Sequence, residues 1–189
     1  MKIIVGLGNP GSDYSETRHN AGRLALEYFA KKNDFPDWKE SNKYFSLISE
    51  GEIGKKPVLL LLPETFMNNS GKAIAHLKAK SYKLKAELIV LHDDIDLPLG
   101  KIKISFGRGS GGHKGVESVI RALKTKDFWR IRIGVSPKNK LPHKKIPDFL
   151  TSPMRKPDFE TLKKSFKKIS EALETMLSKS PEKAMNLFN

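Results

Sequence analysis

Apolar residues follow two patterns along this chain, and the two patterns alternate. Runs of consecutive apolar residues are typical of strands buried on both faces, and they occur at 3–5, 58–62 and 88–91. Apolar residues that recur every three to four positions are typical of amphipathic helices, and they occupy 21–29, 71–81 and 116–123. A strand, a helix and a second strand in this order predict a right-handed parallel crossover.

Three further segments alternate apolar and polar residues, which predicts strands with one polar face. These segments are 44–50, 102–106 and 129–133, and a hairpin turn is predicted at 51–56. In the last two, the polar positions include Lys103, Arg130 and Arg132. We therefore expect two strands whose exposed faces are basic.

The C-terminal part has the pattern of a helix. Apolar residues from Phe159 to Met176 step by three and four positions, with lysines and glutamates between them. A membrane-surface or coiled-coil role fits this pattern too, but fewer than three heptads favour a helix packed on the core. Ser180 and Pro181 predict the start of a short final helix.

These patterns predict the fold class. We expect an α/β fold in which a mixed, largely parallel twisted sheet is sandwiched between helices, with a C-terminal amphipathic helix. Residues 1–189 are expected to form one domain, in which the proline-rich stretch 137–157 is a surface connection.

Three glycines follow the first strand, and the spacing of Gly6, Gly8 and Gly11 matches the dinucleotide-binding fingerprint. That fingerprint requires a helix that begins within the glycines and an acidic residue about 20 positions on, at the end of a second strand. Here Pro10 lies inside the turn, the helix begins near Asn20, and no strand follows where the acidic residue should be. We therefore expect no nucleotide cofactor.

Four sequence blocks, spread over most of the chain, carry a family resemblance. They are GLGNPG at 6–11 with Tyr14 and TRHNAG at 17–22, TFMN at 65–68 with Ser70-Gly71, HDDIDLP at 92–98, and GGHKG at 111–115. In this order and spacing the chain resembles bacterial-type peptidyl-tRNA hydrolases. The resemblance implies hydrolysis of the ester bond between a peptide and the 3′ end of tRNA, which recycles tRNA from prematurely dissociated peptidyl-tRNA. It also implies a monomer whose partner is peptidyl-tRNA, without a cofactor.

Composition narrows the chemistry. Among 189 residues, 35 Lys and Arg against 21 Asp and Glu give a formal net charge of +14, which attracts a polyanion such as RNA. No cysteine is present, so a thiolate nucleophile, a disulfide framework and a Cys-rich zinc site are excluded. No apolar run approaches 18 residues and no targeting segment is recognisable, so we expect a cytoplasmic protein without a membrane partner.

Four polar residues follow predicted strands at the points where these strands end. Asn9 and His19 follow the strand 3–5, Asn68 follows 58–62, and Asp93 follows 88–91. Sites in open α/β sheets form beyond the carboxyl ends of the strands, so we expect these residues to share one rim. The four remaining histidines have simpler explanations within a helix, beside turns or beside lysines. They are His76, His92, His113 and His143.

The rim residues suit hydrolysis by water. An imidazole whose tautomer is fixed by a carboxylate can accept a proton from water, which accelerates a reaction roughly 10²- to 10⁴-fold. The resemblance implies that His19 is this base and Asp93 its partner. No G-x-S-x-G elbow is present, so an acyl-enzyme on serine is not expected. Asn9 and Asn68 could orient the carbonyl or stabilise the oxyanion, although either alone is also compatible with an ordinary turn.

The run HDDID at 92–96 raises the question of a metal site. Neighbouring Asp93 and Asp94 side chains would point apart on an extended chain, and no glycine completes a calcium loop. We therefore expect no metal, and we expect Asp94 and Asp96 to be turn and cap residues.

A glycine-rich loop at 107–112 precedes a predicted helix, whose free N–H groups could hold a phosphate. Basic residues surround it in sequence: Lys101, Lys103, Arg108, Lys114, Arg130 and Arg132. We expect Lys103, Arg108, Lys114 and Arg132 to contact tRNA. The resemblance adds substrate-binding positions at Tyr14, Phe66, Met67, Asn68 and His113.

Two positions depart from the family pattern. The resemblance implies that Arg132 binds the terminal phosphate of tRNA together with a second basic residue. The position of that second residue is occupied here by Ser105, so Lys103 or Arg108 would have to substitute. Lys114 stands where the family usually carries asparagine. A lysine ammonium only donates hydrogen bonds and adds a charge, so Lys114 could hold a phosphate, aid the chemistry or extend into solvent.

Two other classes of function compete with a hydrolase. The glycine spacing leaves a nucleotide-dependent oxidoreductase as a rival enzyme, and the net charge leaves a basic RNA-binding protein without catalysis. Cofactor titration would identify the first, and retained RNA binding without any turnover would identify the second.

Overall fold

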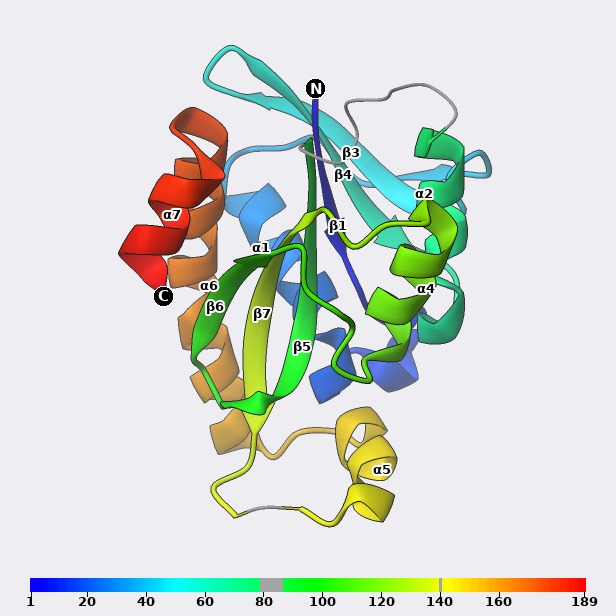
Figure 1. The fold of residues 1–189 in the computed structure, drawn as a ribbon, viewed down its shortest axis with the longest axis vertical. Coiled ribbons are helices and arrows are strands. Elements are labelled where there is room, and N and C mark those ends of the chain that lie inside the picture. Colours follow the sequence, from blue (N-terminus) through cyan, green and yellow to red (C-terminus); the bar gives the residue numbers. More distant parts are fainter. Residues whose placement is uncertain (79–86, 140) are drawn as a thin grey trace.

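The computed structural model describes residues 1–78, 87–139 and 141–189, and a seven-stranded sheet lies at its centre (Figure 1). The strand order is β2-β3-β4-β1-β5-β7-β6. The strands are β1 (Lys2–Gly6), β2 (Lys39–Ser41), β3 (Ser46–Ile53), β4 (Lys56–Pro63), β5 (Leu88–Pro98), β6 (Ile102–Phe106) and β7 (Trp129–Ser136).

The four central strands are parallel. β1 pairs in parallel with β4 on one side and β5 on the other, and β5 pairs in parallel with β7. The edges are antiparallel, through β2 and β3 on one side and β6 on the other. The mixed, largely parallel sheet predicted from the apolar runs is therefore confirmed.

Helices cover both faces of this sheet. They are α1 (Ala21–Lys32), α2 (Gly71–Lys78), α4 (Lys114–Leu123), α5 (Ile146–Thr151), α6 (Lys156–Ser178) and α7 (Pro181–Phe188). Short 3-10 turns lie at η1 (Ser12–Tyr14), η2 (Arg18–Asn20), η3 (Met67–Asn69) and η4 (His143–Lys145). Figure 1 shows α1 and α6 behind the sheet, with α2 and α4 on the other side, away from β6.

The apolar runs are buried on both faces because successive side chains enter different cores. Ile4 of β1 belongs to the apolar cluster that contains α1 and α6, whereas Ile3 and Val5 belong to the cluster of α2 and α4. The long predicted C-terminal helix is α6, and its apolar positions lie in the first cluster. Its role as a helix packed on the core is therefore confirmed.

Several boundaries differ from the prediction. The apolar run that predicted a strand at 88–91 ends at Leu91, but β5 continues to Pro98 because its polar residues still pair with β7. The strand β2 was not predicted, and the hairpin turn after β3 is confined to Gly54 and Lys55. The stretch 137–157 contains the short helix α5, and the predicted helical residues 79–81 lie outside the described residues.

The described residues contain no helix long and apolar enough to span a membrane.

Candidate active site

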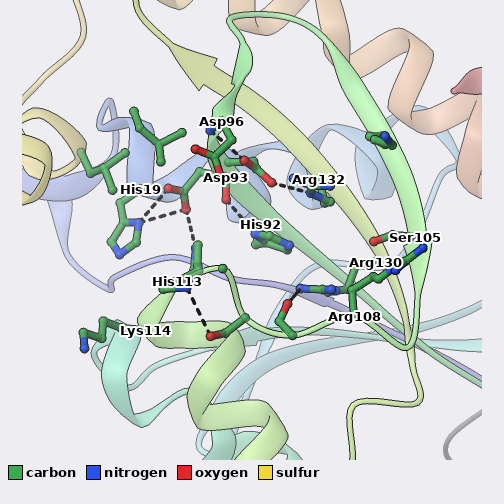
Figure 2. Close-up of a pocket in the computed structure, with 18 of the residues that line it drawn as sticks. His19, His92, Asp93, Asp96, Ser105, Arg108, His113, Lys114, Arg130 and Arg132 are labelled. Carbon is green, nitrogen blue, oxygen red and sulfur yellow. Dashed lines mark hydrogen bonds and ion pairs between the residues drawn. The ribbon is translucent and has the colours of Figure 1, made fainter. Parts of the chain in front are cut away.

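A cleft of about 970 Å³ opens on the α4 side of the sheet. Its floor comes from β5, β6 and β7, and its walls come from the loop before α4 and from α5. Predicted site residues that line it are His19, Asp93, Lys103, Arg108, His113, Lys114 and Arg132. Figure 2 shows His19 and His113 directed at Asp93, whereas Lys114 points away from it.

Asp93 lies at the centre of the polar network and is 1% exposed. Nδ1 of His19 lies 2.9 and 3.0 Å from its two carboxylate oxygens, and Nε2 of His113 lies 2.8 Å from one of them. The expected partnership of His19 with Asp93 is therefore present in the geometry. Asp93 does not follow its strand, however, because it pairs with Ile133 inside the parallel ladder.

A close approach of α1 to β5 brings His19 to Asp93. A Cβ atom at Gly22 would clash with the backbone oxygen of Leu91, so only glycine fits there. The amide side chain of Asn20 accepts from the backbone N–H of Asn9 and donates to its carbonyl. The glycine turn and the histidine are thereby held together. Asn20 is a site residue that was not predicted, although it lies within one of the quoted sequence blocks.

Hydrogen bonds determine where each imidazole carries its proton. Nδ1 of His113 accepts from the backbone N–H groups of Gly115 and Val116, so its proton lies on Nε2 and points at Asp93. His19 donates to Asp93 through Nδ1, which leaves a lone pair on its Nε2. Figure 2 shows this second nitrogen of His19 pointing away from Asp93. No described residue is hydrogen-bonded to it.

The same contacts shift the pKa values in opposite directions. Burial alone would raise the pKa of Asp93, but His19 and His113 together hold it well below its ordinary value. Burial lowers the pKa of His19, but the charge and hydrogen bond of Asp93 outweigh burial and leave that pKa raised. Burial, followed by the influence of His113, drives the pKa of His92 far down, so His92 is neutral.

His113 has a different environment from the one predicted. The resemblance placed it among the substrate-binding residues, but both of its ring nitrogens are engaged within the protein. It caps α4 and supports Asp93, so it acts as a positioning residue. The predicted phosphate site at the start of α4 is wrong in part, since His113 already accepts from the N–H groups of Gly115 and Val116.

Asp94 is an ion-pair partner as well as a turn residue. Its carboxylate accepts from Nε of Arg132 at 2.5 Å, and its other oxygen accepts from the backbone N–H of Asp96. Both aspartates lie in β5. The turn role predicted for Asp94 is confirmed by this bond from the Asp96 N–H, whereas Asp96 lies within β5 and not at the start of a helix. Arg132 enters the cleft with its guanidinium oriented by Asp94.

A second group of predicted residues lies outside the cleft lining. Asn9 is 7% exposed, and its side-chain oxygen accepts from the backbone N–H of Met67 at 2.8 Å. Asn68 is exposed on η3, and the rings of Tyr14 and Phe66 meet edge to face at 6.3 Å. Met67 does not present its side chain to substrate, because it is 4% exposed in the apolar core.

The two groups meet at the start of α4. The sulfur of Met67 packs so closely on Gly115 that a Cβ atom there would clash with it. Gly115 in turn donates to His113, which contacts Asp93. The residues around Asn9 therefore adjoin the Asp93 network, in keeping with the rim that the strand order predicted.

The basic residues occupy different depths of the cleft. Lys103 is exposed on β6, directly opposite Arg132 in the antiparallel ladder. Lys114, the first residue of α4, is 72% exposed in its side chain and lies 3.8 Å from Glu117. The expected alternation in β6 fails at its end, where Ser105 is buried and Phe106 is exposed against Trp129.

Arg18 is a further residue that was not predicted. It is 6% exposed, donates to Asp158 at 3.0 Å, and lies 3.9 Å from the ring centre of Phe149 in α5. Arg18 precedes His19 in the sequence, so the cleft wall formed by α5 is tied to the segment that carries the histidine. The only feature of the sequence that pointed to Arg18 as a site residue was its place inside the TRHN block.

One cluster in the described chain has the composition of a metal site. Ligand atoms of His19, Asp93 and His113 all lie within 4.8 Å of one another. Imidazole N–H protons already occupy the two positions that face the carboxylate. This trio is a different set of residues from the run 92–96. A metal site in that run was considered in the sequence and was not expected.

Comparisons with known proteins agree with one another. The family model described as peptidyl-tRNA hydrolase matches residues 3–189. A peptidyl-tRNA hydrolase of Thermodesulfovibrio yellowstonii is 42% identical over 194 residues, which cover 100% of this chain and 99% of the relative. One of Finegoldia magna is 43% identical over 190 residues, which cover 100% and 97%. The crystal structure of peptidyl-tRNA hydrolase from Acinetobacter baumannii superposes with a TM-score of 0.90 at 30% identity, covering 100% of this chain and 94% of that one.

Proposed function

Since the chain belongs to the peptidyl-tRNA hydrolase family and hydrolyses the ester bond between a peptide and tRNA, we propose that His19 is the general base of this reaction. The observation that carries the proposal is the free Nε2 of His19, whose Nδ1–H is held by Asp93. A base requires a lone pair toward the substrate and a proton on the other nitrogen, and this tautomer has both.

The reaction proceeds by addition of water. His19 accepts a proton through Nε2 as the water oxygen bonds to the carbonyl carbon of the ester, and the carbonyl oxygen becomes an oxyanion. The bond from carbon to the ribose oxygen then breaks, and the proton on His19 passes to that oxygen. Asp93 stabilises the imidazolium between the two steps, and His113 holds Asp93 in place. The products are free tRNA and a peptide with a free carboxylate.

Asn9 and Asn68 are proposed to supply neutral hydrogen-bond donors. The oxygen of the Asn9 amide is occupied by the Met67 N–H, so its amino group remains to donate. A neutral donor can stabilise the oxyanion without adding a charge that would change the pKa of His19. Asn68, exposed beside the Tyr14 and Phe66 pair, is proposed to bind the substrate with these two rings.

Basic side chains at the cleft are proposed to bind tRNA phosphates. Arg132 is oriented by Asp94, and Lys103, Arg108 and Lys114 line the same cleft. Lys114 is exposed and loosely paired, so we assign it to a phosphate and not to the chemistry.

The direct test is incubation of the protein with a peptidyl-tRNA, followed by separation of free tRNA and free peptide. Wild-type protein should release both in equal amounts. His19→Ala should still bind tRNA without turnover, whereas a simple RNA-binding protein would have no turnover to lose. Tight binding of NAD or ATP in a titration would favour the rival oxidoreductase.

The remaining features are proposed on the same basis. Residues 1–189 act as one catalytic domain, and the protein works as a cytoplasmic monomer on peptidyl-tRNA without a nucleotide cofactor. Its activity recycles tRNA from peptidyl-tRNA that dissociates before synthesis is complete. Sedimentation of the active protein would test the oligomeric state.

A further inference from the structure

His92 precedes Asp93 in β5 and is a buried histidine that the proposed mechanism does not use. It is 2% exposed and lies among the residues that line the cleft. Its ring nitrogen Nδ1 lies 2.7 Å from the backbone oxygen of Asp93. A carbonyl oxygen can only accept, so Nδ1 carries the proton and donates it. His92 therefore binds the main chain of Asp93, whereas His19 and His113 bind its side chain.

The carbonyl of Asp93 needs this donor because β1 ends before it. The parallel register of β1 with β5 ends at Gly6 and Leu91. There the N–H of Leu7 donates to the backbone oxygen of Leu91 at 3.0 Å. Alternate carbonyls of a strand point to the same side, so the carbonyl of Asp93 points to the side that β1 has left. A buried carbonyl without a donor costs free energy, and His92 replaces the missing strand at this point.

The ring of His92 also packs against His113. The two ring centres lie 4.8 Å apart at an interplanar angle of 71°, which is an edge-to-face contact. The centre of the His113 ring lies 5.0 Å from that of His19 as well. Figure 2 shows His19 and His92 on opposite sides of Asp93 in this view. Three imidazoles therefore hold one residue, two through its carboxylate and one through its main chain.

His92 is neutral in this position. Burial lowers its pKa most, and the charges of His113 and Arg130 lower it further, against an opposite effect of Asp93. Since Nδ1 carries the proton, Nε2 has a lone pair, and this buried atom has no partner among the residues that the structure describes. A buried nitrogen is not accessible to substrate, so His92 is suited to positioning and not to proton transfer. A neutral ring also holds Asp93 without a second charge that would compete with His19 for the carboxylate.

We propose that His92 is a positioning residue for hydrolysis, which fixes the main chain of Asp93 and the ring of His113 so that the carboxylate stays aligned with His19. This inference rests on the proposed function, because the alignment affects the rate only if His19 is the base. His92 acts through Asp93 and does not touch the substrate. Loss of its N–H leaves the Asp93 carbonyl without a donor, loosens the carboxylate and slows the transfer of a proton to His19.

The first test compares two replacements of similar shape. His92→Asn places an amide nitrogen close to the position of Nδ1 and keeps a donor, whereas His92→Leu removes it, and both lose the ring contact with His113. Single-turnover hydrolysis of peptidyl-tRNA should be roughly five- to tenfold slower in His92→Leu, as expected for loss of one hydrogen bond, with KM largely kept. His92→Asn should recover most of the rate. Equal rates in these two variants, or a wild-type rate in His92→Leu, would overturn the proposal.

His92→Phe covers the case in which His92→Leu does not fold. Phenylalanine keeps an aromatic ring against His113 and lacks the N–H, so the rate should fall as in His92→Leu. A wild-type rate in His92→Phe would show that the donor is not needed and would overturn the proposal.

The second test uses NMR titration of the histidine rings and no substrate. Asp93 and His113 are the titratable groups in contact with the His19 ring in the described parts of the chain, and Asp93 raises the pKa of His19. A looser carboxylate should therefore lower the pKa of His19 in His92→Phe. The matched control is Ser165→Ala, which removes a buried hydrogen bond to the backbone of α6 outside the cleft lining.

Ser165→Ala should lower the stability of the protein and leave the pKa of His19 unchanged. A merely structural His92 would give the same result, with a loss of stability in His92→Phe and no shift of that pKa, which would overturn the proposal.

The two proposals fail separately. Wild-type protein that leaves peptidyl-tRNA intact would overturn the proposed function, while the NMR titration would still decide whether His92 aligns Asp93 with His19. An active enzyme in which His92→Phe changes neither the rate nor the pKa of His19 would overturn the role of His92 alone.

Discussion

For individual side chains, the important feature is that one carboxylate serves two imidazoles. Asp93 accepts from His19 and from His113, and the two histidines differ in what their other nitrogen contacts. In His113 that nitrogen caps α4, whereas in His19 it has no hydrogen-bond partner among the described residues. In the proposed mechanism, one pair of backbone N–H groups therefore distinguishes the positioning residue His113 from the base His19.

Loss of the base should be more severe than loss of its partner. His19→Ala should reduce kcat by roughly 10²-fold or more, and Asp93→Asn should reduce it less because the imidazole remains. Both variants should bind tRNA with near wild-type affinity. Single-turnover hydrolysis and filter binding would measure the two effects, and wild-type turnover by His19→Ala would exclude His19 as the base.

The pH profile should report the raised pKa of His19. Only the neutral imidazole can accept a proton, so kcat/KM should fall as the pH decreases through this pKa, which lies above the ordinary value of about 6.5. In Asp93→Asn the carboxylate charge is lost while burial remains, so the acid limb should move to lower pH. Rates measured from acidic to mildly alkaline pH would show this, and an acid limb that is the same in both proteins would contradict the assignment.

Lys114 should affect binding more than chemistry. Its ammonium is exposed at the rim and pairs with Glu117 at 3.8 Å. Lys114→Asn should therefore raise KM and weaken the salt dependence, with kcat largely kept. A fall in kcat instead would assign Lys114 to the reaction, and unchanged values of both constants would remove it from the site.

Among the secondary-structure elements, α5 is tied to the segment that carries His19. Arg18 of η2 donates to the backbone oxygen of Phe149 and to Asp158 at the start of α6. The preceding Thr17 forms an antiparallel bridge with Pro153. The cleft wall formed by α5 is therefore held by the residues directly before His19.

Removing the contacts of Arg18 should lower the stability of the fold and should also impair substrate binding in the cleft. Arg18→Met leaves Asp158 without its buried partner, and the free energy of unfolding should fall by about 2 kcal/mol. KM should rise because α5 is no longer held over the cleft. Arg155→Met is the matched control, since Arg155 contacts the same carboxylate but is 82% exposed, and it should change stability by less than about 0.5 kcal/mol. Equal losses in the two variants, from urea unfolding, would contradict this account.

Across the protein as a whole, charge and topology act together. The net charge of +14 attracts a polyanion from any direction, but the cleft gathers Lys103, Arg108 and Arg132 beside the proposed catalytic pair. We therefore expect the general charge to accelerate encounter with tRNA, and the local cations to determine how it is bound.

Affinity for tRNA should fall steeply as salt increases, because bound phosphates release counterions. Arg132→Ala should weaken binding and reduce the slope of log affinity against log salt by about one. Arg121→Ala, which removes an exposed charge outside the cleft lining, should leave the slope nearly unchanged. Affinities measured between low and moderate salt would test this, and a salt-independent affinity would contradict binding through phosphates.

The amino-acid pattern by itself was sufficient for the central architecture and for the candidate residues of the reaction. Runs such as that at 58–62 are typical of strands buried on both faces, as in a parallel sheet covered by helices, and this strand does pair in parallel with β1. Parallel strands bring their carboxyl ends to one edge, so Asn9, His19 and Asp93 could be assigned to one site before their contacts were known. These features depend on which side chains avoid water and on the direction in which each strand runs. Both can be inferred from short stretches of the sequence.

Only the tertiary structure decided which groups are paired, because pairing depends on contacts between residues far apart in the sequence. Asp94 was predicted as a turn residue, and it does accept from the N–H of Asp96, but its other oxygen pairs with Arg132, 38 residues away in β7. His113 was assigned to substrate, yet α4 and Asp93 occupy both of its nitrogens. Arg130 and Arg132 are equally basic in the sequence, but Asp94 pairs with Arg132, and Nε of Arg130 has no hydrogen-bond partner among the described residues. Hydrogen-bond satisfaction is a property of the folded neighbourhood, which no pattern of apolar and polar positions contains.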